Sequence, residues 1–150
     1  MLFRSLKIMD NSEKTPLHYA AAGNSLECSK FLLEKGADAN LQDNFGRDAA
    51  NTLLTLAKKE NIELFKTLIE KSTDIERRDK DKKTLFIIAA EKGYAGYAKI
   101  LMSLNVSPLS KDFSGKTALD YAAESLEAGR LDSGTFDEIA AYTQKIKEKL

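Results

Sequence analysis

The sequence predicts an all-α fold, a solenoid of stacked helix-turn-helix units joined by hairpin-like loops. A polar stretch that opens with aspartate recurs at Asp10, Asp43, Asp79 and Asp112, with equal first and last intervals and a middle interval three residues longer. Each polar stretch precedes two short apolar segments at helical spacing. Such a period is typical of repeats that bury their apolar faces against neighbouring repeats.

The period divides the 150 residues into four repeats of a single domain. We expect residues 1–9 to form an N-terminal cap and the repeats to occupy residues 10–42, 43–78, 79–111 and 112–150. The first helices of the repeats are predicted to start at Thr15, Asn51, Thr84 and Thr117. This alignment places the three extra residues of the second repeat in its loop, at residues 47–50, where an insertion is often specific to a partner.

The first repeat shows the elements of a unit most clearly. Thr15 is a favourable N-cap residue, and Pro16 occupies the first helical position, where a missing backbone N–H has no cost. Apolar residues at helical spacing indicate one helix within residues 17–21 and a second within 26–33. Gly36 follows the second helix, as is typical of a helix end.

The stretches TPLHYAA and FLLEKGADAN of the first repeat resemble the signature of the ankyrin repeat. The other copies read NTLLTLA with TLIEKSTDIE, TLFIIAA with ILMSLNVSPL, and TALDYAA. The resemblance covers residues 10–150 and implies a small ankyrin protein whose concave face and loop tips bind another protein. It also implies that Glu13 and Lys82 replace a hairpin glycine, and that Ser72 and Asn105 replace the helix-ending glycine.

The only histidine and the only cysteine of the chain are expected to be structural. The resemblance implies that His18 hydrogen-bonds around the helix start together with Thr15, and no partner for catalysis recurs near it. Cys28 follows Leu26 on the second helix and is expected to be a small buried hydrophobe. One histidine and one cysteine do not make the usual zinc set, and no phosphate-binding glycine motif is present. We therefore expect no catalytic residue, no metal and no cofactor.

The C-terminal repeat is longer between its helices, by eight residues in the alignment of apolar positions. Thr135 and Glu138 have the spacing of a capping box, and Phe136, Ile139 and Ile146 then lie along one helical face. The sequence therefore predicts a final helix from Thr135 that closes the stack.

Composition excludes several classes of protein. Lys and Arg total 23, as do Asp and Glu, so no basic excess points to nucleic acid. No apolar run is long enough to span a bilayer, and the N-terminal residues lack the pattern of a signal peptide. A single cysteine suits a reducing compartment, so we expect a cytoplasmic or nuclear protein that is monomeric on its own.

The surface that binds a partner is predicted from the helix register and the loop tips. Tyr19, Thr55, Ile88 and Tyr121 are expected at equivalent concave positions. Exposed aromatic and basic side chains are common in binding hot spots. The predicted partner-binding residues are Tyr19, Phe45, Arg47, Thr55, Lys59, Ile88, Lys92, Phe113 and Tyr121.

One hairpin carries the run RRDKDKK, residues 77–83, with five basic and two acidic residues. Such a run is either a solvated loop tip or a contact for an acidic partner segment. The sequence as a whole predicts a non-enzymatic adaptor, scaffold or inhibitor. The alternatives are a subunit that associates through the ends of its stack, and a microbial effector that binds a host protein.

Overall fold

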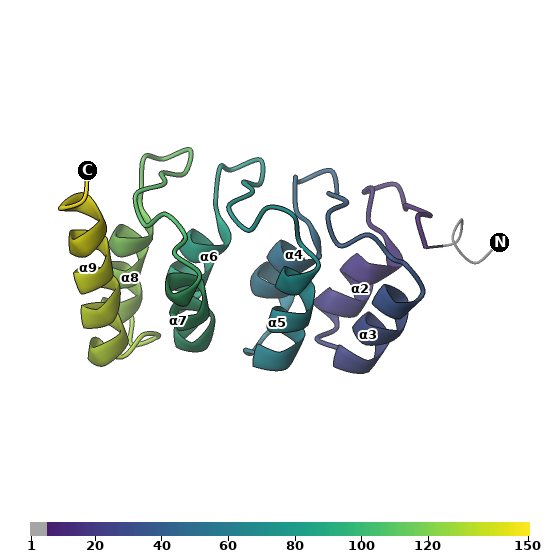
Figure 1. The fold of residues 1–150 in the computed structure, drawn as a ribbon, viewed down its shortest axis with the longest axis horizontal. Coiled ribbons are helices and arrows are strands. Elements are labelled where there is room, and N and C mark those ends of the chain that lie inside the picture. The colour runs from purple at the N-terminus through teal and green to yellow at the C-terminus, as the bar shows by residue number, and fades with distance from the viewer. Residues whose placement is uncertain (1–5) are drawn as a thin grey trace. The chain divides into compact units, whose positions relative to one another are not determined.

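The computed structural model describes residues 6–150, which form eight α-helices and contain no strand (Figure 1). The prediction of an all-α fold is therefore confirmed for the described residues. Residues 1–5 of the predicted N-terminal cap lie outside the described residues. Within the rest of that segment, Leu6 is buried, whereas Ile8 and Met9 are exposed. The chain divides into two compact units, Met1–Ile75 and Glu76–Leu150.

Unit 1 contains the first two repeats as two helix pairs, α2 (Pro16–Ala22) with α3 (Leu26–Glu34) and α4 (Ala49–Leu56) with α5 (Ile62–Glu70). Helix α2 packs on α3 and α4, while α5 packs on α3 and α4. The loops that precede α2 and α4 project to the same side of this unit (Figure 1). Its core holds Leu17, Leu53 and Leu64, all of them almost fully buried.

Unit 2 repeats this arrangement with α6 (Leu85–Lys92) and α7 (Ala95–Ser103), followed by α8 (Ala118–Glu127) and α9 (Ser133–Lys147). Helix α6 packs on α7 and α8, and α9 packs on α7 and α8. Tyr97, Leu101 and Ile139 are fully buried in its core. Small residues such as Ala89 and Ala122 are also fully buried on the first helices, so neighbouring helices can approach closely.

The predicted helix start at Asn51 is wrong. The N-cap of α4 is Asp48, whose carboxylate accepts a 2.9 Å hydrogen bond from the backbone N–H of Asn51. The caps of the four first helices are thus Thr15, Asp48, Thr84 and Thr117, which follow the same intervals as the recurrent aspartates. Because aspartate caps a helix as well as threonine does, the position keeps its role with a different residue.

The three extra residues of the second repeat therefore do not lie at residues 47–50. They lie between its two helices, since the caps Asp48 and Asn61 are three residues further apart than the caps Thr15 and Ser25. The backbone leaves the helix at Ala57, which is extended with φ −69° and ψ 142°. The longer segment, residues 57–60, connects α4 to α5 at the end of the pair that is opposite the hairpin.

The last helix starts earlier than predicted. Asp132 is the N-cap of α9, and its side chain accepts a 2.8 Å hydrogen bond from the backbone N–H of Thr135. The predicted capping box of Thr135 with Glu138 is therefore wrong, because both residues lie inside the helix. The caps Thr117 and Asp132 are five residues further apart than the caps of the first repeat, so the insertion is five residues and not eight.

The recurrent aspartates form the same turn in all four repeats. Oδ1 of Asp10 accepts backbone hydrogen bonds from Ser12 and Lys14 at 2.8 and 2.9 Å. Asp43, Asp79 and Asp112 do the same with the residues two and four positions later. The turn also needs a left-handed residue at its tip, and Glu13 and Lys82 adopt φ of 60° where the other repeats have glycine.

Candidate functional site

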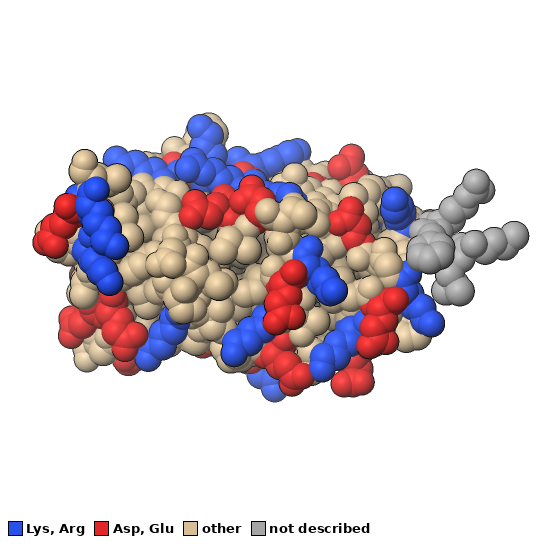
Figure 2. Space-filling model, in the orientation of Figure 1, with Lys and Arg blue, Asp and Glu red and all other residues tan. Residues whose placement is uncertain are grey.

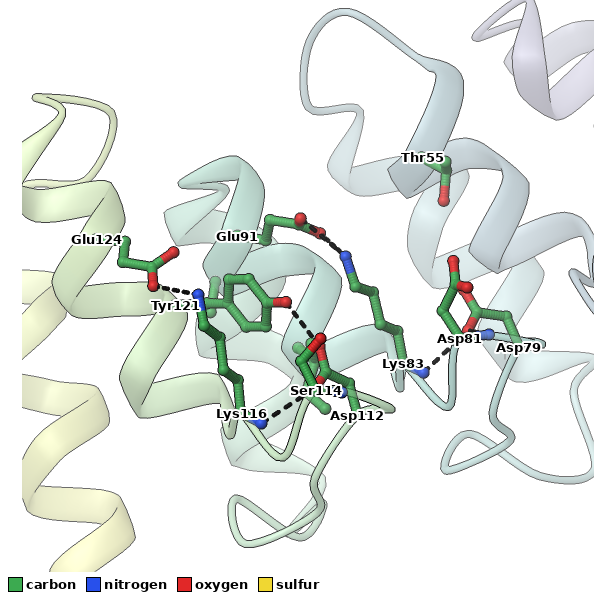
Figure 3. A network of polar contacts seen from close by, with 12 residues as sticks. Thr55, Asp79, Asp81, Lys83, Glu91, Asp112, Ser114, Lys116, Tyr121 and Glu124 are labelled. Atoms are coloured by element: carbon green, nitrogen blue, oxygen red, sulfur yellow. Dashed lines mark hydrogen bonds and ion pairs between the residues drawn. The ribbon is translucent and has the colours of Figure 1, made fainter.

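The hairpins and first helices of unit 2 carry a network of polar contacts (Figure 3). Tyr121 of α8 is buried, and its hydroxyl donates a 2.6 Å hydrogen bond to Oδ2 of Asp112. The Nζ atoms of Lys83 and Lys116 each lie 5.1 Å from the centroid of the Tyr121 ring. This distance is within the range of a cation–π contact, so Tyr121 positions both lysines at the base of the hairpins.

Each of these lysines also forms an ion pair with a glutamate eight residues later. Nζ of Lys83 lies 2.8 Å from Glu91, and Nζ of Lys116 lies 2.5 Å from Glu124. The pair of Lys116 with Glu124 is partly exposed, so water weakens its electrostatic attraction. The consequence for the surface is that the cations at the base of both hairpins are neutralised by carboxylates on the first helices.

The network also fixes protonation states. Burial by itself would raise the pKa of Asp112, but hydrogen bonds from Tyr121, Lys116 and Ser114 outweigh it and hold that pKa below its usual range. Burial, followed by the hydrogen bond to Asp112, raises the pKa of Tyr121 well above its usual range. Tyr121 is thus a protonated donor to an ionised acceptor at neutral pH, a pairing stronger than a neutral hydrogen bond.

The first repeat contains the same three-residue arrangement. The hydroxyl of Tyr19 donates to Oδ2 of Asp10, and Nζ of Lys14 lies 5.9 Å from the centroid of the Tyr19 ring. The hydrogen bond from Tyr19 is the main cause that lowers the pKa of Asp10. In the second repeat Thr52 takes the tyrosine position, and Oδ2 of Asp43 is buried without a hydrogen-bond partner among the described residues.

Two hairpin tips present exposed aromatic rings. Phe45 is 49% exposed, and the guanidinium of Arg47 lies 5.0 Å from its ring centroid. Phe113 is 77% exposed, with Nζ of Lys82 at 5.5 Å from its ring centroid. Both rings lie on turns that hydrogen bonds of Asp43 and Asp112 hold in place, so they are accessible to another molecule.

Most of the predicted partner-binding residues reach the surface. Tyr19, Phe45 and Phe113 are exposed aromatic residues. Lys59 and Lys92 are exposed, and Arg47 and Thr55 are half-buried. The structure thus gathers Tyr19, Phe45 and Arg47 on the hairpin side of unit 1, and Phe113 on the hairpin side of unit 2, whereas Lys59 follows α4 at the opposite end.

Ile88 is not a surface residue, since only 2% of it is exposed. Its neighbours on α6, Ile87 and Ala89, are also buried, so this helix is apolar on most of its circumference. A polar substitution at Ile88 would therefore disturb the core. Thr55 is not the counterpart of Tyr19 either, because the cap at Asp48 makes Thr52 the equivalent position and aligns Thr55 with Glu91.

Cys28 is exposed, which corrects the expectation of a buried position. The counterparts of Cys28 three residues after the N-caps of α5, α7 and α9 are Leu64, Tyr97 and Thr135, and all three are buried. The first repeat thus leaves uncovered a face that the later repeats bury. An open, mostly apolar groove of about 720 Å³ lies there, lined among others by Cys28, Phe31 and Leu32.

His18 is a structural residue. Its Nδ1 accepts a 3.0 Å hydrogen bond from the backbone N–H of Thr15, so the ring hydrogen of the neutral form is on Nε2. Nε2 in turn donates a 2.8 Å hydrogen bond to the carbonyl oxygen of Arg47 in the next hairpin. The expected contact with Thr15 is therefore present, and the imidazole also joins two consecutive repeats.

Two features of the surface were missed in the sequence. The first is Lys111, an exposed cation two residues before Phe113. Its position one repeat length after Arg78 is the feature of the sequence that could have indicated it. The second is the repeated lysine-to-glutamate spacing of eight residues in the third and fourth repeats. Both signals become visible only once the hairpins are aligned on their aspartates.

Within residues 6–150, no group of three or more His, Cys, Asp and Glu side chains is arranged to bind a metal ion. In the same range, no helix combines the length and the apolar character that crossing a membrane requires.

Stacked pairs of short helices with aspartate-anchored hairpins define a repeat protein of the ankyrin class. A family model described as "Ankyrin repeats (3 copies)" matches residues 53–134, and an "Ankyrin repeat" model matches residues 12–44. The chain belongs to the ankyrin-repeat family. Ankyrin repeats are generally non-enzymatic modules that bind other proteins.

Curated relatives match over three quarters of the chain. Neurogenic locus notch homolog protein 1 of Danio rerio is 36% identical over 115 residues, which are 76% of this chain and 5% of that protein. The human protein of the same name is 35% identical and human neurogenic locus notch homolog protein 2 is 34% identical, each over 115 residues. The chain spans only 4–5% of the length of these relatives.

Proposed function

We propose that this protein is a non-enzymatic adaptor, scaffold or inhibitor that binds one partner protein through its hairpin tips and the adjoining first helices. The observation that supports this proposal most directly is the exposure of Phe45 and Phe113 on ordered turns. Aromatic residues beside cations are enriched among residues that dominate binding energy.

The hairpin geometry favours binding because it is already ordered. In each tip an aspartate accepts two backbone hydrogen bonds, and the tip of unit 2 is further supported by the hydrogen bond from Phe113 N–H to the carbonyl of Asp81, at 2.8 Å. A surface that is ordered before binding loses little conformational entropy in the complex. Little of the binding free energy gained at these tips is therefore lost to ordering them.

The non-enzymatic part of the proposal is supported by the state of His18. Both of its ring nitrogens are engaged with Thr15 and Arg47, and the side chain is 1% exposed. A general base needs access to a substrate proton, and this imidazole has none.

The test is affinity capture from native lysate followed by quantitative mass spectrometry. The double variant Phe45→Ser with Phe113→Ser removes both exposed rings. We expect recovery of the specific partner to fall at least about tenfold, since each lost aromatic anchor typically costs more than about 1 kcal/mol.

The matched control is Ile62→Ser with Leu104→Ser, which removes two exposed apolar side chains that do not belong to the hairpin tips. This variant is expected to retain the partner, and circular dichroism should show that both variants are folded. If both variants lose the partner equally, or if neither does, the hairpin tips are not the binding surface.

A second function, self-association, is favoured by one observation. The uncovered groove of the first repeat carries Phe31 and Tyr19, each 55% exposed, and Ile8 and Met9 nearby in the sequence are also exposed. If this face joins two copies, sedimentation equilibrium should show a mass that rises with concentration. The variant Phe31→Ser should then remain monomeric over the same range.

A further inference from the structure

A cluster of cations lies on the two hairpins of unit 2. We call it the basic hairpin surface, and it comprises Arg78, Lys80, Lys82, Lys111 and Phe113. Figure 2 shows lysine and arginine side chains gathered along the edge where these hairpins project. The two hairpins touch, because Phe113 N–H donates its hydrogen bond to the carbonyl oxygen of Asp81.

The charge of this surface is not balanced locally. Residues 77–83 and 110–116 contain seven basic and three acidic residues. Two of the acidic residues, Asp79 and Asp112, are buried and bind the turns, so Asp81 is the one exposed carboxylate in these two segments. Within the described part of the chain, no ion pair involves Lys80, Lys82 or Lys111.

The position of the acidic residues explains why these lysines remain unpaired. Glu91 and Glu124, on the first helices, are engaged by Lys83 and Lys116 at the base of the hairpins (Figure 3). Lys82 is held over the ring of Phe113, and Nη2 of Arg78 lies 3.4 Å from Oγ of Ser110, so two of the cations at the tips have defined positions.

We propose that the basic hairpin surface binds an acidic segment of a partner protein, with an apolar side chain of that segment packed on Phe113. This inference rests on the proposed function and names the chemistry of its partner. Asp and Glu side chains complement the four exposed cations, and the exposed ring offers the one large apolar contact among them.

A nucleic acid fits this surface less well. Phosphate-dominated binding generally uses about six to ten phosphate contacts, and single-stranded binding adds several stacking aromatic residues. The surface offers four exposed cations and a single ring, on a chain whose net charge is zero. A short peptide with clustered carboxylates and one apolar residue matches this number and mixture of groups.

The experiment is fluorescence anisotropy with the full chain and a labelled peptide of about 12 residues, made of Glu and Asp around a central Leu. The comparison peptide has Gln and Asn in place of Glu and Asp. We expect the acidic peptide to bind at least about tenfold more tightly than its neutral counterpart, and the preference to weaken as salt rises from about 50 to 300 mM, because salt screens exposed charges.

The test variant is Lys80→Glu/Lys82→Glu/Lys111→Glu. Its matched control is Lys145→Glu/Lys147→Glu/Lys149→Glu, which makes the same change in charge at exposed lysines of the same unit outside the two hairpins. We expect the test variant to lose at least about tenfold in affinity and the control to stay within about threefold. Phe113→Ala should weaken binding while the salt dependence is unchanged.

Equal losses in the two triple variants, or equal affinity for the two peptides, would overturn the inference. Tighter, hairpin-dependent binding of an RNA duplex of about 20 base pairs would overturn it in favour of nucleic acid. If the acidic peptide does not bind but capture of a partner still depends on Phe45 and Phe113, the proposed function stands. Only the inference that the partner segment is acidic is then wrong.

Discussion

The imidazole of His18 stabilises the start of the first repeat. His18 accepts from Thr15 N–H at the start of α2 and donates to the Arg47 carbonyl in the following hairpin. Both contacts involve backbone groups, and the side chain is buried. Buried backbone groups that lose their partners are costly, so the residue is more important for stability than its size suggests.

We expect His18→Ala to lower the free energy of unfolding by about 2–4 kcal/mol, from the two lost hydrogen bonds and the cavity left behind. Urea denaturation followed by circular dichroism measures this change. Lys66→Ala, at an exposed position, is the control and should change stability by less than about 0.5 kcal/mol. A loss for His18→Ala as small as that of the control would contradict the structural role.

The sequence predicts the role of a residue best when that role depends on its near neighbours in the chain. The aspartate turns depend on contacts within four residues, so the recurrence of Asp10, Asp43, Asp79 and Asp112 in the sequence marks the position of each hairpin. Ile88 and Cys28 could not be placed in this way. Their exposure depends on which helices lie beside them, and equivalent residues of different repeats differ in that respect.

At the scale of helices, the error at α4 came from two residues that can both cap a helix. Asp48 and Asn51 stand three residues apart, and both have the side-chain acceptor that an N-cap needs. Packing decides between them, because Ala49 and Ala50 are buried at 1% and 2% exposure and extend the helix toward its N-terminus. The helix pattern was predictable, but the choice of cap depended on tertiary contacts.

The variant Asp48→Ala tests this assignment. It removes the acceptor for Asn51 N–H and should lower the free energy of unfolding by about 1–2 kcal/mol. Asp48→Thr, which copies the cap of the other three repeats, should remain within about 0.5 kcal/mol of the wild type. If alanine and threonine are equally destabilising in urea denaturation, Asp48 is not the cap. That outcome would favour the helix start at Asn51.

For the whole molecule, the sequence predicted the fold class because the repeat supplies the same information four times. One degraded copy, such as the second with Asp48 and Thr52 in place of Thr and Tyr, does not hide the period. The partner surface was only partly predictable. Its charge arises from hairpins that are one full repeat apart in the sequence, so it emerges only when the repeats are aligned with one another.

The single domain predicted from chain length and the two compact units of the structure lead to different expectations for unfolding. In a repeat protein each repeat is stabilised by its neighbours, so a local defect need not spread through the chain. A defect placed in one unit should therefore show how far cooperativity extends.

Ile139→Ala creates a cavity at a fully buried position of α9 and should cost about 2–4 kcal/mol. We expect hydrogen exchange to accelerate in α7, α8 and α9 while α2 and α3 keep their protection, because the defect lies in unit 2. The reciprocal variant Leu17→Ala, at a buried position of α2, should expose α2, α3 and α4 and leave α8 and α9 protected. Uniform acceleration across all helices in both variants would instead show that the chain unfolds as one cooperative domain, as its length predicts.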